Sequence, residues 1–372
     1  MAKELKIDKP LKEGVQYLLR SLLEKGKVKG VFTLKKVNEN GSIAYSLITN
    51  PDEIKDTLSF HPLMPANAGQ LLSNFTLNGA VSEPVAVVIK PCELRAFIEL
   101  VKRKKANLEN IFIISSTCGG VYPLDHAING AIEKNISNYW DAVKACNIPG
   151  DIRSVCKACE QFIPSKYADI VVPLLGTTGI DNETRMFLST ENGEKLVEGL
   201  GLEGSTLADV SELETAEIKT LRGKRAEEKK KLADEIGIDQ LGIKGLVNLF
   251  GRCIGCRGCR AVCPICYCQL CNFDSQNSKY KLSEHELSRK GGLRIPPNTV
   301  YYHLLRLAHM GISCVGCGTC EDACPANIPI SGIFKLAGES IQGVFDYIPG
   351  RDVEEEIPLK MFELEELEKV ED

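Results

Sequence analysis

The sequence contains no long apolar segment and no excess of positive charge. None of its apolar runs approaches the roughly 18–20 residues that a helix needs to cross a membrane. The formal net charge is -5, and Lys and Arg are dispersed or interleaved with Glu, which disfavours nucleic acid as a partner. The first residues, MAKELKIDKPLKEG, lack the apolar core of a signal peptide. We therefore expect a cytoplasmic protein that has no membrane span and binds no nucleic acid.

Histidine is scarce, and a dinucleotide-binding motif is absent. The histidines are His61, His126, His285, His303 and His309. None of them lies inside a cysteine cluster, which argues against mixed Cys/His zinc sites. No stretch matches Gly-x-Gly-x-x-Gly, the fingerprint of dinucleotide binding, so a reductase that binds NAD(P)H directly is a weaker interpretation.

Cysteine, in contrast, is abundant. The chain has 372 residues, enough for two domains, and 16 of them are cysteines. The cytoplasm keeps thiols reduced, so disulfides are a poor explanation for so many cysteines. We therefore expect metal binding in an otherwise ordinary globular protein, in which 44% of the residues are hydrophobic and 26% are charged.

The N-terminal half shows the pattern of an α/β domain. Residues 11–35 read as an amphipathic helix followed by a short strand. VAVVIK at 85–90 and IFIISS at 111–116 are short apolar runs that suit strands buried on both faces, and a helical segment lies between them. ADIVVPLLG at 168–176 is a further strand candidate. Together these segments predict a mixed sheet with helices.

The composition divides the chain into parts. A Glu- and Lys-rich helix follows the first domain; it is either a basic docking surface or, as we favour, a solvated helix that joins two domains. The acidic C-terminal tail is expected either to be mobile or to lie on a partner. We predict a first domain at 1–211, a helical linker at 212–245, a ferredoxin domain at 246–345 with an insert at 272–313, and the tail at 346–372.

Two cysteine quartets share the spacing C-x2-C-x2-C-x3-C-P, which is the bacterial ferredoxin run. The first quartet is Cys253, Cys256, Cys259 and Cys263, and the second is Cys314, Cys317, Cys320 and Cys324. In this run the fourth cysteine binds the cluster of the other quartet. Zinc sites usually show two C-x2-C pairs instead, so we predict an α+β bacterial-type ferredoxin domain with two [4Fe–4S] clusters. The predicted ligands of the first cluster are Cys253, Cys256, Cys259 and Cys324. Those of the second are Cys263, Cys314, Cys317 and Cys320.

The segment between the quartets is longer than in a minimal ferredoxin. It contains a polar loop and one expected helix at about 298–310. This insert either contacts a partner or packs over the clusters. Three further cysteines, Cys266, Cys268 and Cys271, follow no known spacing. They either bind a fourth cluster together with a non-cysteine or partner ligand, or pack around the module.

Four upstream cysteines form another possible site. Cys92 and Cys118 each follow a predicted buried strand, so their loops are expected at the same edge of the sheet. The pair Cys156 and Cys159, brought to that edge, would complete four thiolates. The alternative is that these cysteines are small buried hydrophobic residues, and we assign Cys146 to that class.

The motifs KPCE, CKAC…YADI and CIGC…CPICYC…CVGC…CEDACP resemble a known family. The upstream part is similar to the beta subunit of coenzyme F-420-reducing hydrogenase. The longer form with a ferredoxin module resembles the beta subunit of formate dehydrogenases that use the same deazaflavin. The resemblance covers about residues 80 to 340 and implies a third [4Fe–4S] cluster, with ligands Cys92, Cys118, Cys156 and Cys159.

The resemblance also implies an FAD beside the third cluster. The flavin would exchange a hydride with a soluble carrier and pass single electrons to the clusters. The glycine-rich stretch that such proteins carry near the N-terminus is reduced here to Gly14, so we assign part of its role to residues 61–75. Lys90 lies near the flavin or a cluster, or alternatively forms a surface salt bridge. The expected flavin contacts are Lys90, Asn67, Gly69, Thr117 and Gly119.

The resemblance thus implies an oxidoreductase subunit that works in a larger complex. Its partner would be a catalytic formate dehydrogenase or hydrogenase subunit, because nothing in this chain resembles a molybdopterin or nickel–iron site. The alternative is a flavin-free adaptor that links a dehydrogenase to heterodisulfide-reductase-like subunits.

Overall fold

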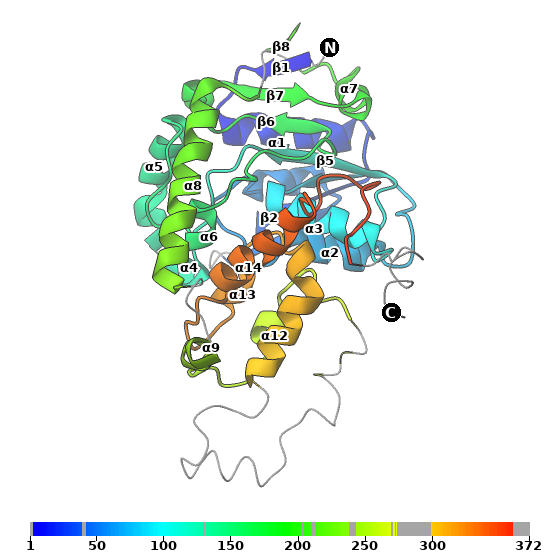
Figure 1. Cartoon of the computed structure of the whole chain (residues 1–372). Coiled ribbons are helices and arrows are strands. Elements are labelled where there is room, and N and C mark those ends of the chain that lie inside the picture. Colours follow the sequence, from blue (N-terminus) through cyan, green and yellow to red (C-terminus); the bar gives the residue numbers. More distant parts are fainter. Residues whose placement is uncertain are drawn as a thin grey trace.

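The computed structural model describes most of the chain. The described residues are 3–38, 42–128, 131–202, 204–209, 213–237, 243–268, 271, 273 and 299–359. They form one large sheet in the N-terminal part and a group of helices in the C-terminal part, which lies below the sheet in Figure 1. Within this part of the chain, every helix is too short or too polar to span a bilayer.

The sheet is mixed, as the sequence predicts. Its strands follow the order β3-β2-β4-β5-β6-β7-β1-β8. Strands β2, β4, β5 and β6 run parallel, whereas β3, β7, β1 and β8 each pair antiparallel to a neighbour. The bounds are β1 Lys3–Ile7, β2 Gly30–Lys36, β3 Ile43–Ile48, β4 Val85–Val88, β5 Ile111–Ser116, β6 Ile170–Val172, β7 Thr184–Leu188 and β8 Ser205–Asp209.

Helices cover both faces of the sheet. In β4, Ala86 and Val88 join the apolar core under α1 and α5, while Val85 and Val87 join the core under α2 and α3. This alternation explains why β4 reads as a continuous apolar run in the sequence. The helix bounds are α1 Leu11–Glu24, α2 Ala68–Thr76, α3 Pro91–Lys102, α4 Leu124–Ile128, α5 Ala131–Lys144, α6 Ser154–Lys157 and α7 Glu191–Val197.

The parallel strands fix the position of the upstream cysteines. Because β4, β5 and β6 are parallel neighbours, their carboxyl ends lie at one edge of the sheet. Cys92 lies in the first turn of α3, directly after β4, and Cys118 follows β5. The expectation that both loops emerge at the same edge is therefore confirmed.

The C-terminal part is helical in its described residues, with no strand in 243–268 or 299–359. The β component of the expected α+β ferredoxin domain is thus not present in those ranges, because the segments that flank the quartets carry apolar residues at helical spacing. The helices are α9 Ile243–Phe250, α10 Gly258–Ala261, α12 Thr299–Met310, α13 Thr319–Asp322 and α14 Ile330–Val344. The expected insert helix corresponds to α12, whereas the polar loop at 274–298 lies outside the described residues.

Two connecting segments differ from expectation. Helix α8 (Ala216–Ile236) runs along the side of the molecule from the sheet to the helical part (Figure 1) and buries Arg225, so it is more than a solvated linker. The start of the acidic tail is also packed. Tyr347 is buried and donates to Glu99 of α3, and the backbone N–H of Gly350 donates to the same carboxylate at 2.9 Å. This contact corrects our expectation of a mobile or partner-bound tail for residues 346–359.

Candidate functional site

The third site, as we call it, lies at the edge of the sheet and consists of Cys92, Cys118, Cys156 and Cys159. Gly120 follows Cys118 at a φ of +109°, and a Cβ built on it would lie 3.1 Å from Cβ of Cys156. Residue 120 must therefore be glycine for the two loops to approach. The backbone N–H of Gly120 also donates to Sγ of Cys118 at 3.4 Å.

The thiols of the third site are close enough to affect one another's charge. Burial raises the pKa of Cys92 well above its usual value, with further increases from Glu93, Cys317, Cys118 and Cys156. Burial likewise raises the pKa of Cys156 to about 12. Charge interactions decay with distance, so the effects of Cys118 and Cys156 on Cys92, and of Cys159 on Cys118 and Cys156, agree with neighbouring side chains. Such a site disfavours bare thiolates and fits thiolates that bind iron.

Arg225 closes the third site from α8. Its guanidinium donates to the carbonyls of Cys118 at 3.1 Å, Gly119 at 3.2 Å and Cys159 at 3.3 Å, and only 1% of the residue is exposed. It also lies over the ring of Phe162, 4.5 Å from the centroid. The sequence gives no local sign that Arg225 is buried, because this residue occurs among ten other Lys, Arg and Glu residues within one polar helix.

The five residues predicted to contact a flavin surround the third site, and each makes contacts within the protein. The ammonium of Lys90 is buried and donates to the carbonyl of Leu63 at 3.0 Å, so the surface salt bridge is wrong. Asn67 caps α2 by accepting from the N–H of Gly69 at 2.9 Å. The hydroxyl of Thr117 accepts from the N–H groups of Leu174 and Leu175 at 2.8 and 2.9 Å.

The two glycines of that set allow close packing. A Cβ on Gly69 would lie 2.5 Å from the carbonyl oxygen of Glu93 in α3. A Cβ on Gly119 would lie 2.7 Å from the hydroxyl of Tyr139 in α5. Among the five expected flavin contacts, Asn67 keeps one donor group available for a ligand, because its side-chain Nδ2 has no hydrogen-bond partner within the described residues.

The first site, as we call it, combines cysteines of both quartets that lie close together: Cys253, Cys256, Cys259 and Cys324. Burial raises the pKa of Cys253, and Cys259, Cys256 and Cys324 add to the increase. A Cβ on Gly258 would lie 3.0 Å from the carbonyl oxygen of Ala323, so the loop before Cys324 packs against the first quartet. The N–H of Gly255 donates to Sγ of Cys253 at 3.4 Å.

Cys263, Cys314, Cys317 and Cys320, the second site, line one small cavity together. Its other lining residues include Pro264, Met310 and Phe334, so the cavity is largely apolar. Burial raises the pKa of Cys314 to about 11, and the charge of Cys317 adds to the increase. Four convergent thiols in an enclosed apolar cavity are a donor set that suits a [4Fe–4S] cluster.

Across the described ranges, no three His, Cys, Asp or Glu side chains are close enough to bind a single metal ion.

The second and third sites are neighbours. The thiol of Cys317 raises the pKa of Cys92, after burial and Glu93. Arg153 lies between the two loops: it donates to the carbonyl of Cys317 at 2.8 Å and forms a buried ion pair with Asp322. From α3, Arg95 donates to the carbonyl of Val315 and Arg103 donates to Ser313 at 2.6 Å. The helix that carries Cys92 therefore holds the loop that carries Cys314 and Cys317.

The remaining cysteines do not form one group. Cys146 packs in the core beside the sheet, whereas Cys266 and Cys271 pack in the core of the C-terminal part. Cys146 is therefore not a fourth ligand for them. Sγ of Cys266 lies 3.5 Å from the sulfur of Met310, and Cys268 is exposed.

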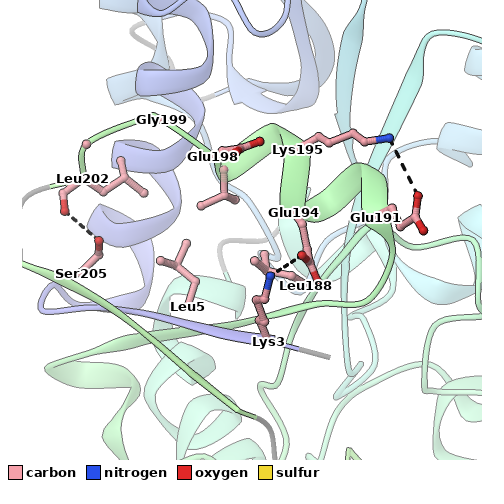
Figure 2. A pocket seen from close by; sticks show the side chains of 12 residues that line it. Lys3, Leu5, Leu188, Glu191, Glu194, Lys195, Glu198, Gly199, Leu202 and Ser205 are labelled. Carbon is pink, nitrogen blue, oxygen red and sulfur yellow. Dashed lines mark hydrogen bonds and ion pairs between the residues drawn. The ribbon is translucent and has the colours of Figure 1, made fainter. Parts of the chain in front are cut away.

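A cavity of about 690 Å³ lies away from these sites, between β1, β7 and α7. Figure 2 shows Lys3 directed toward Glu194, and Lys195 toward Glu191 at 3.9 Å. Both of its lysines pair with glutamates, and no cysteine lines it. This cavity is therefore not part of the candidate redox site.

Residues 252–328 match the family described as the 4Fe–4S dicluster domain. The chain is 30% identical to the F-420-dependent formate dehydrogenase subunit beta of Methanocaldococcus jannaschii over 370 residues, with 91% of each chain covered. It is 28% identical to the F-420-dependent formate dehydrogenase 1 subunit beta of Methanococcus maripaludis, again with 91% of each chain covered.

Among solved structures, the chain is similar to one in the F-420-reducing [NiFe] hydrogenase complex of Methanosarcina barkeri. The identity is 12% and the TM-score is 0.46, over 63% of this chain and 91% of that chain.

Proposed function

Because the chain belongs to the family of F-420-dependent formate dehydrogenase beta subunits, which confirms the resemblance seen in its motifs, we propose that it conducts electrons through three [4Fe–4S] clusters. It is an iron–sulfur subunit of an oxidoreductase complex. The observation that carries the proposal is the convergence of its cysteines on three groups of four, two of which adjoin at Cys317 and Cys92.

The proposed ligands are those of the three sites. Cys253, Cys256, Cys259 and Cys324 would hold the first cluster, Cys263, Cys314, Cys317 and Cys320 the second, and Cys92, Cys118, Cys156 and Cys159 the third. These contacts suggest that electrons pass through the clusters in the order first, second, third. Cys324 of the second quartet lies near Cys253, and Cys317 lies near Cys92 of the third site. The catalytic formate dehydrogenase or hydrogenase subunit would dock at the first site, where Cys256 and Ile254 are exposed.

The other end of the route is proposed to be an FAD next to the third site. A flavin supplies the conversion between one-electron and hydride transfer, which cubanes alone do not perform. Lys90 supports this placement, since its buried ammonium lies near Cys118, and so does the unpaired Nδ2 of Asn67. Next to the third site, the protein would hold the flavin and exclude water. A soluble deazaflavin is the proposed electron carrier.

Anoxic purification from the native host tests the cluster assignment. We expect about 12 iron atoms per chain, four for each cubane. A catalytic partner subunit should co-purify. A chain that purifies alone, as a fully active monomer, would contradict the role as a complex subunit.

Acid extraction tests the flavin separately. Release of one FAD per chain supports reduction of a soluble carrier. Intact clusters without any released flavin would contradict the proposal that the chain binds FAD. The adaptor function would then remain, in which electrons pass directly between protein partners. The structural roles already found for Asn67, Gly69 and Thr117 are the observation that favours this second candidate.

A further inference from the structure

Helix α12, in the insert between the quartets, presents three polar side chains to the sulfurs of the first site: Tyr302, His303 and Arg306. The guanidinium of Arg306 donates from Nη1 to Sγ of Cys259 at 3.2 Å. The hydroxyl of Tyr302 lies 3.6 Å from the same sulfur, and Nε2 of His303 lies 3.5 Å from Sγ of Cys253. Positions 302, 303 and 306 share one face of a helix, so this arrangement follows from the helical repeat.

Arg306 is held firmly in this position. Only 3% of it is exposed, and its guanidinium lies 4.8 Å from the ring centroid of Phe334 and 5.7 Å from that of Tyr302. Its Nη2 also donates to the carbonyl of Cys259 at 3.2 Å. A side chain that is clamped between two rings and bonded at two atoms loses little freedom when a cluster binds.

Among the described residues, the charge of Arg306 lacks a carboxylate partner. Within the described part of the chain, no Asp or Glu forms an ion pair with it, and its Nε has no acceptor. Burying a guanidinium is costly unless a negative group balances it. Thiolates on an iron–sulfur cluster are such a group, so the residues around the first site fit an anionic cluster.

A positive charge at this place has a predictable effect on redox chemistry. Reduction of a [4Fe–4S] cluster adds one electron and makes the cluster more negative. Hydrogen bonds and positive charge near the sulfurs stabilise that added charge and raise the reduction potential. We therefore propose that Arg306, together with Tyr302 and His303, raises the reduction potential of the first cluster. This inference rests on the proposed cluster-binding function.

The effect should differ among the three clusters. Among the three sites in the described residues, Arg306 donates to the first site, at Cys259, and it also donates to the sulfur of Met310, while its charge reaches Cys263 and Cys320 of the second site. Within the described residues, the hydrogen bonds of Arg306 go to Cys259 and Met310 and not to a third-site cysteine. Loss of Arg306 should thus shift the first cluster most, the second less and the third not at all. A general loss of stability would not produce this order.

The test is a potentiometric titration followed by EPR, with dithionite as the reductant, on the complex carrying Arg306→Met. We expect the equilibrium constant for reduction of the first cluster to fall about tenfold, or ~59 mV for a one-electron couple. Tyr302→Phe removes one hydroxyl and should give a smaller shift in the same direction. Arg252→Met is the matched control: it removes the same charge one residue before Cys253, but Arg252 is exposed and donates to the carbonyl of Asn327 at 3.2 Å.

The outcomes separate this inference from the function on which it rests. A wild-type complex without cubane EPR signals would overturn the function itself. Intact clusters with unshifted potentials in Arg306→Met, or an equal shift in Arg252→Met, would overturn only the role of Arg306. If Arg306→Met loses iron, Tyr302→Phe decides the matter, because this change keeps the helix packed. An unchanged potential of the first cluster in Tyr302→Phe would then reject the proposal.

Discussion

Arg225 links two parts of the chain that the sequence separates by about 70 to 110 positions. It supplies donors to three carbonyls of the third site, from Cys118, Gly119 and Cys159. Its Nε has no hydrogen-bond partner in the described ranges.

Arg225→Ala should therefore open the third site. Unsatisfied buried carbonyls and the space left by the side chain should lower the free energy of unfolding by about 3 kcal/mol. Iron content should fall by about four atoms per chain. Iron analysis and urea unfolding check both values. Lys219→Ala, an exposed change of the same charge in α8, should alter neither; equal losses in the two variants would disprove the role of Arg225.

His61 gives a prediction about pH. Burial, then the charge of Lys90, lowers the pKa of His61 to about 4. The unfolded chain takes up this proton near pH 6.5 but the folded protein does not, so stability is lost as pH falls below 6.5. At about pH 5 the loss is about 2 kcal/mol. Urea unfolding at about pH 7 and pH 5 should show a smaller pH dependence for His61→Gln than for the wild type. An unchanged pH dependence would exclude His61 as its source.

At the scale of elements, the packing of α2 on α3 depends on a missing side chain. Gly69 faces the backbone of α3, where the carbonyl of Glu93 and the N–H of Phe97 lie 2.5 and 2.7 Å from the position of a Cβ. Backbone atoms cannot move aside as side chains do. Because α3 also carries Cys92, this contact sets how closely α2 approaches the helix that bears one cysteine of the third site.

Gly69→Ala should force α2 away from α3 and lower the free energy of unfolding by about 1–3 kcal/mol. Gly223→Ala is the matched control, because Gly223 lies in α8 with nothing within 4 Å of its Cβ position. That variant should gain about 0.5–1 kcal/mol from helix propensity. Thermal unfolding compares the two. The same sign of change in both variants would contradict the packing argument.

Periodicity in the sequence predicted several strands and helices, but it did not predict which polar side chains are buried against them. The strands near Val85 and Ile111 and the helix at α12 follow from apolar runs and helical spacing, which are local signals. The burial of Arg153, Arg225 and Arg306 depends on what packs against them from distant parts of the chain. Their neighbours in sequence are equally polar, so no local pattern distinguishes them. The proposed iron ligands carry a clearer local signal, because their spacing within a loop is itself the motif.

At the scale of the whole molecule, the sheet and the C-terminal helices are joined by buried charge. Arg153 follows the loop before α6 and Asp322 lies in α13, and 4% and 5% of their side chains are exposed. Arg153 also donates to the carbonyl of Met64 at 3.1 Å. The same ion pair therefore fixes the second site against the third.

Breaking this pair should be costly, because one buried charge remains unpaired. Arg153→Met or Asp322→Asn alone should lower the free energy of unfolding by about 3–5 kcal/mol. The double variant should recover part of that loss, since neither charge is then left alone. A double-mutant cycle in urea measures the coupling. Strictly additive effects would mean that the pair does not join the two parts.

The exchange of cysteines between the quartets has a consequence for biosynthesis. If the ligands are as proposed, the third site is complete once Cys159 has left the ribosome, whereas the first must wait for Cys324. Domains fold as they emerge, from the N-terminus onward. A ribosome that pauses within residues 272–313 thus exposes three thiols of one unfinished site and one of another. That nascent chain is the form of this protein most vulnerable to oxygen.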